Sequence, residues 1–254
     1  MNVSGGVLVL LMLMGLVGGI GITAVGPGGV LPTIGLVILT DLSPASVAGT
    51  SIVTHIGTGI VGTAAYTRSG QLREPDTRRV AALLAAAAVA GTPLGVLANS
   101  WVEGDVFAVL LAVAVAVVGV LVWVREHHLR REESLAPLAA PLVLGVGLGV
   151  ALVAGLFGLG GPMLSVPLLV ICGLPVRRAL GAAQAQSVVI AAIGTAGYLA
   201  QGTIDWPLAF AIGVPELAGV LIGWRVAHAV SSRQLKYALA IVLVSLTPYL
   251  ALHG

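Results

Sequence analysis

Two ionisable side chains lie near the middle of long apolar runs, where an ionisable group is costly. They are His55, in the run 44–66, and Glu216, in the run 207–224. Ionisable residues inside a membrane segment are functional candidates by default, and a histidine exchanges a proton near neutral pH. Both are therefore candidates for proton coupling, with a purely structural histidine as an equal alternative for His55.

Two glycine-rich stretches interrupt the apolar runs, GPGG at 26–29 and GLGG at 158–161. Glycine and proline break helices, and Pro162 is favoured at the first position of a new helix. A helix that starts inside a membrane presents free N–H groups and the positive end of its dipole. We therefore expect two half-helix starts that attract a small anion. The candidate binding residues are Gly26, Gly28, Gly29, Gly158, Gly160 and Gly161.

Neutral polar side chains at a similar depth complete this predicted site. Ser51 and Thr54 share one helix face with His55, and Gln184 and Ser187 lie in the corresponding run 179–200. Such neutral donors suit a small oxyanion. For any single hydroxyl, the alternative is a hydrogen bond to a neighbouring helix.

The composition predicts an all-α polytopic membrane protein. Of its 254 residues, 58% are hydrophobic and 9% charged, and the mean hydropathy is +1.08, values outside the range of soluble domains. The apolar runs predict 8 to 10 helical segments. Those at 29–40 and 162–174 are too short to cross a hydrocarbon core of about 30 Å.

Several other classes of function are disfavoured. The single cysteine, Cys172, excludes an internal disulfide and a cysteine-based metal cage. The formal charge of +2 comes from short loops between apolar runs, so it indicates membrane orientation rather than nucleic-acid binding. No arrangement of catalytic side chains is convincing, and we expect no enzyme activity, no metal and no cofactor.

The chain contains an internal repeat. The stretch 62–72 matches 194–204 in Gly, Thr, Ala, Tyr and Gly at an offset of 132, and the same offset places the glycines of 26–29 on those of 158–161. We therefore expect one membrane domain made of two repeats, 1–130 and 138–254, joined by a cytoplasmic loop at 131–137.

The charges predict that the two repeats are inverted. If each repeat is a glycine-tipped helical hairpin followed by three spanning helices, all 12 basic residues fall on one side, which cytoplasmic loops favour. Parallel repeats would place five of them outside. The inverted arrangement puts both termini outside, and inverted repeats with interrupted helices are typical of secondary transporters.

Glycines at a spacing of four recur in both halves, at Gly91 and Gly95 and at Gly219 and Gly223. Small residues at this spacing let membrane helices pack closely. We expect a packing role for them rather than a ligand role.

The ordered and duplicated motifs resemble the sulfite exporter TauE/SafE family. The doubled glycine hairpin, the stretch PASVAGTS from Pro44 with its echo from Pro175, and the Tyr66 and Tyr198 turns that end in Gly70 and Gly202 carry the resemblance. It implies a multi-pass permease of the cell inner membrane for sulfite or an organosulfonate such as sulfoacetate, acting as an exporter. It supplies no ligand residues for transfer.

The sequence thus predicts a secondary transporter of a small anion, bound near the midplane between the two hairpin tips. Its expected partners are the anionic substrate, the lipid bilayer and a coupling proton or ion, and a homo-oligomer is left open. The alternatives are an anion channel of the same architecture and a membrane scaffold that transports nothing.

Overall fold

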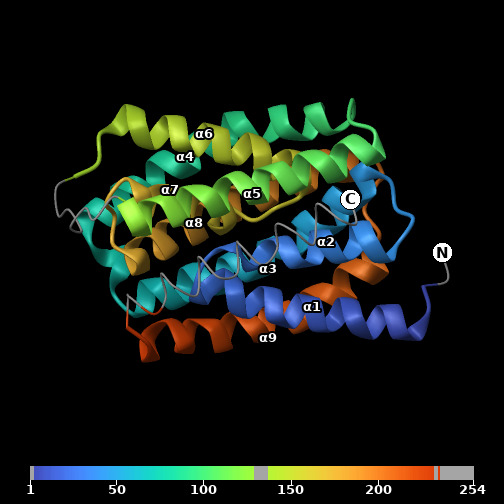
Figure 1. The fold of residues 1–254 in the computed structure, drawn as a ribbon, viewed down its shortest axis with the longest axis horizontal. Helices are drawn as coiled ribbons and strands as arrows, with labels where there is room; N and C mark the ends of the chain where they lie inside the picture. Colours follow the sequence, from blue (N-terminus) through green and yellow to red (C-terminus); the bar gives the residue numbers. More distant parts are fainter. Residues whose placement is uncertain (1–2, 129–136, 232–233, 235–254) are drawn as a thin grey trace.

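The computed structural model describes residues 3–128, 137–231 and 234, and this part of the chain is helical without strands (Figure 1). The first half contains α1 (Gly5–Ala24), the short 3-10 turn η1 (Pro27–Gly29), α2 (Val30–Leu39), α3 (Pro44–Arg68), η2 (Gln71–Arg73), α4 (Pro75–Asn99) and α5 (Gly104–His128). The second half contains α6 (Ala140–Phe157), α7 (Pro162–Ile171), α8 (Val176–Ala200) and α9 (Trp206–Ala229).

The helix lengths fit a multi-pass membrane protein. Five of the described helices, α1, α4, α6, α8 and α9, are long and apolar enough to cross a membrane. By contrast, α2 and α7 have 10 residues each, which at 1.5 Å per residue is about 15 Å, half of a hydrocarbon core. The prediction of an all-helical membrane protein with two short helices is therefore confirmed.

Helices from the two halves alternate in the packing. At the centre, α3 packs against α8, while α1 packs along α9 and α4 packs along α6. The paired glycines make these contacts close. A Cβ on Gly91 would lie 2.7 Å from the carbonyl oxygen of Leu148 on α6, and Gly219 and Gly223 lie against the backbone of Leu16 and Ile20 on α1. The predicted packing role of the glycines is confirmed.

Several polar contacts join the helix ends at one end of the bundle, which we call the basic end. Arg178 at the start of α8 pairs with Glu74 just before α4, with 2.5 Å between Nε and Oε2. Arg177 donates to the Val230 carbonyl after α9, and Arg79 donates to the Leu138 carbonyl before α6. The start of α4, α6 and α8 and the end of α9 therefore lie together.

Some predicted features lie outside the described residues. They are the connecting loop at 131–137 apart from Pro137, the last apolar run at 237–252, and the basic residues Arg130, Arg131, Arg233 and Lys236. Elsewhere the helices begin and end within a few residues of the apolar runs. The differences arise because polar residues such as Asp76 and His228 extend α4 and α9 beyond their apolar parts.

Candidate anion site between two hairpin tips

Both hairpins turn at a glycine that a larger residue would strain. After α1, Gly26 adopts a φ of 112°, and after α6, Gly158 adopts a φ of 70°. These left-handed values favour glycine because it lacks a Cβ. Each turn ends one helix and starts a short second one, so four helix termini are placed inside the bundle.

The end of α1 has carbonyl groups that the helix itself cannot satisfy. The Tyr66 hydroxyl donates to the Thr23 carbonyl at 2.6 Å, and the Gln184 amide donates to the Ile22 carbonyl at 3.2 Å. In lipid an unsatisfied backbone group is expensive. These two side chains satisfy the carbonyl groups and so allow α1 to end inside the membrane.

The end of α6 is satisfied in a similar way, by the tyrosine at the corresponding position and by an amide at a position that does not correspond. The Tyr198 hydroxyl donates to the Gly155 carbonyl at 2.7 Å, and the Asn99 amide donates to the Leu156 carbonyl at 2.8 Å. The two tyrosines are 132 positions apart, and so are their acceptors. One hydrogen bond is thus made twice, once at the end of each hairpin's first helix.

Removing either hydroxyl should destabilise the protein by a similar amount. We expect Tyr66→Phe and Tyr198→Phe each to cost about 0.6 to 1.7 kcal/mol, the range measured for hydrogen bonds between membrane helices. Thermal unfolding in detergent measures the loss. Thr195→Val is the control, because the Thr195 hydroxyl has no hydrogen-bond partner. A loss in only one of the two tyrosine variants would contradict the equivalence of the two hairpins.

The starts of the two short helices, unlike the ends of α1 and α6, receive no hydrogen bond from a side chain. Neither α2, which follows Gly29, nor α7, which follows Gly161, has a side chain that caps its first N–H groups. In α7 the Ser165 N–H is the first to find an acceptor, the Gly161 carbonyl at 3.0 Å. The preceding N–H groups, at Met163 and Leu164, have no acceptor within the helix. The starts of α2 and α7 are therefore left without a side-chain cap, although the Val30 N–H that begins α2 donates to carbonyls of η1.

His55 lies between the two tips. A Cβ on Gly29 would come 3.1 Å from Cε1 of the imidazole, and a Cβ on Gly160 would come 3.3 Å from its Nδ1. The same Cβ on Gly160 would lie 3.2 Å from Oγ of Ser187, the residue 132 positions after His55. The structure therefore brings one tip from each half to a single histidine.

Glu216 is the acidic neighbour of this histidine. Its Oε1 lies 3.5 Å from Nδ1 of His55, and the exposed fractions of the two side chains are 0% and 1%. None of their four nitrogen and oxygen atoms makes a hydrogen bond of standard geometry among the described residues, although the Gly29 backbone lies beside the imidazole and Thr54 beside the carboxyl. Buried polar atoms are rarely left unpaired. This imidazole and carboxyl, between two helix starts that lack side-chain caps, form a site with unused hydrogen-bonding capacity.

The predicted tip glycines fall into two groups. Gly29, Gly160 and Gly161 face α3 and α8, since a Cβ on Gly161 would lie 3.1 Å from the Ala183 carbonyl oxygen. The others are packing positions: Gly28 lies against α1, Gly158 against Ala48 of α3, and Gly26 against Pro162 and Val166 of α7. Gly26 thus holds the first tip against the second hairpin, although it does not face His55.

The predicted polar residues are also divided between the site and the helix contacts. Ser51 shares a hydrogen bond of 2.8 Å with Thr33 of α2, and Gln184 supports the end of α1 through its nitrogen, while its Oε1 has no partner. Thr54 lies beside Glu216, but its hydroxyl donates to the Ser51 carbonyl at 2.9 Å. Ser187 alone of these four lies at a tip, beside Gly160.

The main feature that the sequence prediction missed is the contact between His55 and Glu216. The two residues are 161 positions apart, and no local pattern links them. The roles of Asn99 and Gln186 were also missed. Gln186 accepts from the Ser165 hydroxyl at 2.5 Å and donates to the Gly147 carbonyl at 3.2 Å, which ties α8 to α7 and α6. A polar amide within an apolar run is the only signal that pointed to these residues.

Comparison with known proteins identifies the family. The model of the sulfite exporter TauE/SafE family matches residues 11–250. The chain belongs to the TauE/SafE family. It is similar to the probable membrane transporter protein YdhB of Bacillus subtilis, with 23% identity over 96% of this chain and 97% of that protein.

A second relative of this TauE/SafE protein is archaeal. The probable membrane transporter protein MJ0441 of Methanocaldococcus jannaschii is 25% identical over 47% of this chain and 48% of its own length. No solved structure matches the chain significantly. The family and these relatives support a multi-pass membrane transporter.

Proposed function

We propose that this protein is a secondary transporter of a small anion, which binds where the tips at Gly29 and Gly160 meet His55. The observation that carries the proposal is the contrast between the helix termini. Side chains satisfy the buried carbonyl ends of α1 and α6, whereas no side chain caps the starts of α2 and α7. Free N–H groups and the positive dipole end favour an anion, and a protonated imidazole adds a full positive charge.

We infer an oxyanion of sulfur, such as sulfite or a sulfonate like sulfoacetate, as the substrate, and export as the direction. The family description as a sulfite exporter supports both inferences. The free donors at the tips are backbone N–H groups, which suit the several acceptor oxygens of a sulfite or sulfonate group. No arginine or lysine is needed in the site.

We also propose that the two halves are inverted repeats. Three observations support this arrangement: the Tyr66 and Tyr198 hydrogen bonds are equivalent, the contacts of α1 with α9 and of α6 with α4 are equivalent, and α1 and α6 begin at opposite ends of the bundle (Figure 1). If the basic end lies in the cytoplasm, as the positive-inside rule favours, the N-terminus is outside the inner membrane.

We propose that His55 and Glu216 couple transport to protons. A net charge at so deep a position is costly. Without a bound anion, we therefore expect His55 and Glu216 to hold one proton between them and to be neutral as a pair. A monoanion brings one negative charge, which a second proton on the pair balances. A monoanion therefore travels with one proton.

Flux measurements with purified protein in liposomes test the function. We expect saturable uptake of sulfite or a sulfonate, faster than uptake of sulfate or a simple carboxylate, and driven by a proton gradient. Large single-channel currents would instead show the anion channel. An intact protein with no flux of any of these anions would support the scaffold and overturn the proposal.

A further inference from the structure

A crevice at the basic end is lined by cations above an apolar floor. It has a volume of about 530 Å³ and lies between α3, α4 and α8. Its floor is made of four alanines and Leu72, Thr63 and Thr67 of α3 line one side, and Arg73 and Arg78 line its mouth. Arg73 ends η2 and Arg78 is in the first turn of α4, so the mouth lies where the helices end.

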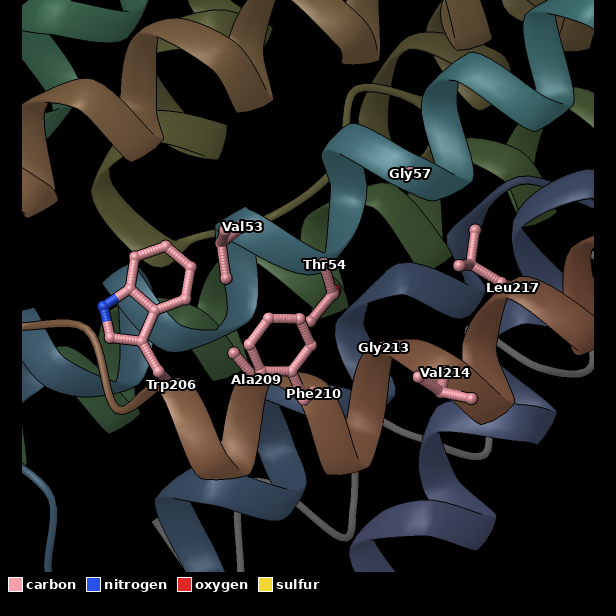
Figure 2. A pocket seen from close by; sticks show the side chains of 9 residues that line it. All are labelled: Val53, Thr54, Gly57, Trp206, Ala209, Phe210, Gly213, Val214 and Leu217. Carbon is pink, nitrogen blue, oxygen red and sulfur yellow. The ribbon is translucent and has the colours of Figure 1, made fainter.

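The same crevice occurs a second time, between α3 and α9, and Figure 2 shows its lining. Four of its residues on α9 each lie 128 positions after a residue of the first crevice: Trp206 after Arg78, Ala209 after Ala81, Phe210 after Ala82, and Gly213 after Ala85. The second crevice is smaller, about 210 Å³, and its lining includes no charged residue. Equivalent positions have thus acquired different chemistry, which the repeat alone does not explain.

Arg73 and Arg78, at the mouth of the crevice, differ from the neighbouring arginines in their contacts. Arg178 is paired with Glu74, and Arg177 and Arg79 donate to backbone carbonyls. In the part of the chain that the structure describes, neither Arg73 nor Arg78 forms an ion pair. Both side chains are exposed. Two unpaired guanidinium groups therefore face the membrane surface over an apolar crevice.

We propose that this crevice binds an anionic phospholipid of the adjacent leaflet. The phosphate lies between Arg73 and Arg78, whose guanidinium groups match phosphate oxygens. An acyl chain occupies the floor formed by Ala81, Ala82, Ala85 and Ala185. Charge complementarity selects the anionic headgroup, and the apolar floor selects a lipid over free phosphate. The site is independent of the transported anion.

Thermal unfolding of the purified protein in detergent tests this site. Short-chain phosphatidylglycerol should raise the melting temperature by about 5 °C, whereas phosphatidylcholine of the same chain length and inorganic phosphate should not. In Arg73→Ala/Arg78→Ala the stabilisation by phosphatidylglycerol should be lost. The matched control is Arg68→Ala/Arg225→Ala, which removes two exposed arginines at the same end outside the crevice and should keep the stabilisation.

Native mass spectrometry gives a second measurement that does not depend on stability. Bound phosphatidylglycerol should fall at least tenfold in Arg73→Ala/Arg78→Ala relative to the control variant. Equal stabilisation by phosphatidylcholine would show that the floor is filled without selection for charge, and equal stabilisation by phosphate would show a site for a free anion. Either result, or unchanged lipid retention in the variant, would overturn the proposal.

Discussion

Anion transport should fall by roughly 100-fold when Gly160 is replaced with leucine, because the new side chain would occupy the space between the second tip and His55. A Cβ alone would already lie 3.2 to 3.3 Å from Ser187 and the imidazole, which is tighter than ordinary contact. Overpacking of a well-packed core typically costs 1–3 kcal/mol, and the upper value corresponds to roughly 100-fold in binding. Radiolabelled anion uptake into liposomes measures the loss.

Two further variants separate a lost site from a lost fold. Gly160→Ala adds only the Cβ and should retain part of the transport, since its neighbours need to move by only a few tenths of an ångström. Gly149→Leu is the matched control on α6, where a Cβ meets no atom within 4 Å, and it should transport normally. Normal flux through correctly folded Gly160→Leu would exclude this tip as the binding site.

The second large effect is expected at the histidine. His55→Gln leaves Glu216 without the group that becomes positive when the anion binds, so proton-driven transport should be lost. An unbalanced buried charge costs about 3–5 kcal/mol, which corresponds to at least roughly 100-fold in affinity. Anion uptake driven by a pH gradient, with the membrane potential clamped, measures the effect.

Glu216→Gln should have a different consequence. It leaves the imidazole that takes up a proton with the anion, so proton-driven transport should persist. Its dependence on pH should change, because the site without anion no longer shares a proton between two groups. His228→Gln is the control, because His228 lies on α9 at the basic end, where its Nδ1 contacts the Trp224 carbonyl at 2.9 Å. Unchanged pH profiles in both His55→Gln and Glu216→Gln would rule out coupling through this pair.

The fold was predictable wherever the signal was local. Pro162 at the first position of a helix and the glycines of 26–29 marked the interruptions, and the glycine pairs marked the close helix contacts. Each of these residues acts on the backbone within a few positions or on any helix beside it. The positions of glycine and proline in the sequence therefore predicted where the helices are interrupted and which helix faces pack closely.

The site was less predictable because it depends on which helices meet. His55 and Glu216 stood out as buried ionisable groups, but only the packing of α3 against α9 brings them together. Gln184 was predicted to bind substrate, and in the structure its amide nitrogen donates a hydrogen bond to the Ile22 carbonyl at the end of α1. A polar side chain in an apolar run shows that a partner is required, and the fold decides whether that partner is a ligand or a backbone carbonyl.

The hydrogen bonds at the ends of α1 and α6 make the two halves mutually dependent subunits fused into one chain. Each half supplies its own tyrosine, and an amide from the other half donates to a second carbonyl: Gln184 to Ile22, and Asn99 to Leu156, which the Tyr198 hydroxyl also reaches at 3.3 Å. Separated halves would each retain the tyrosine and lose the amide bond from the other half. The fusion therefore does more than join two copies, because each copy completes the interrupted helix of the other.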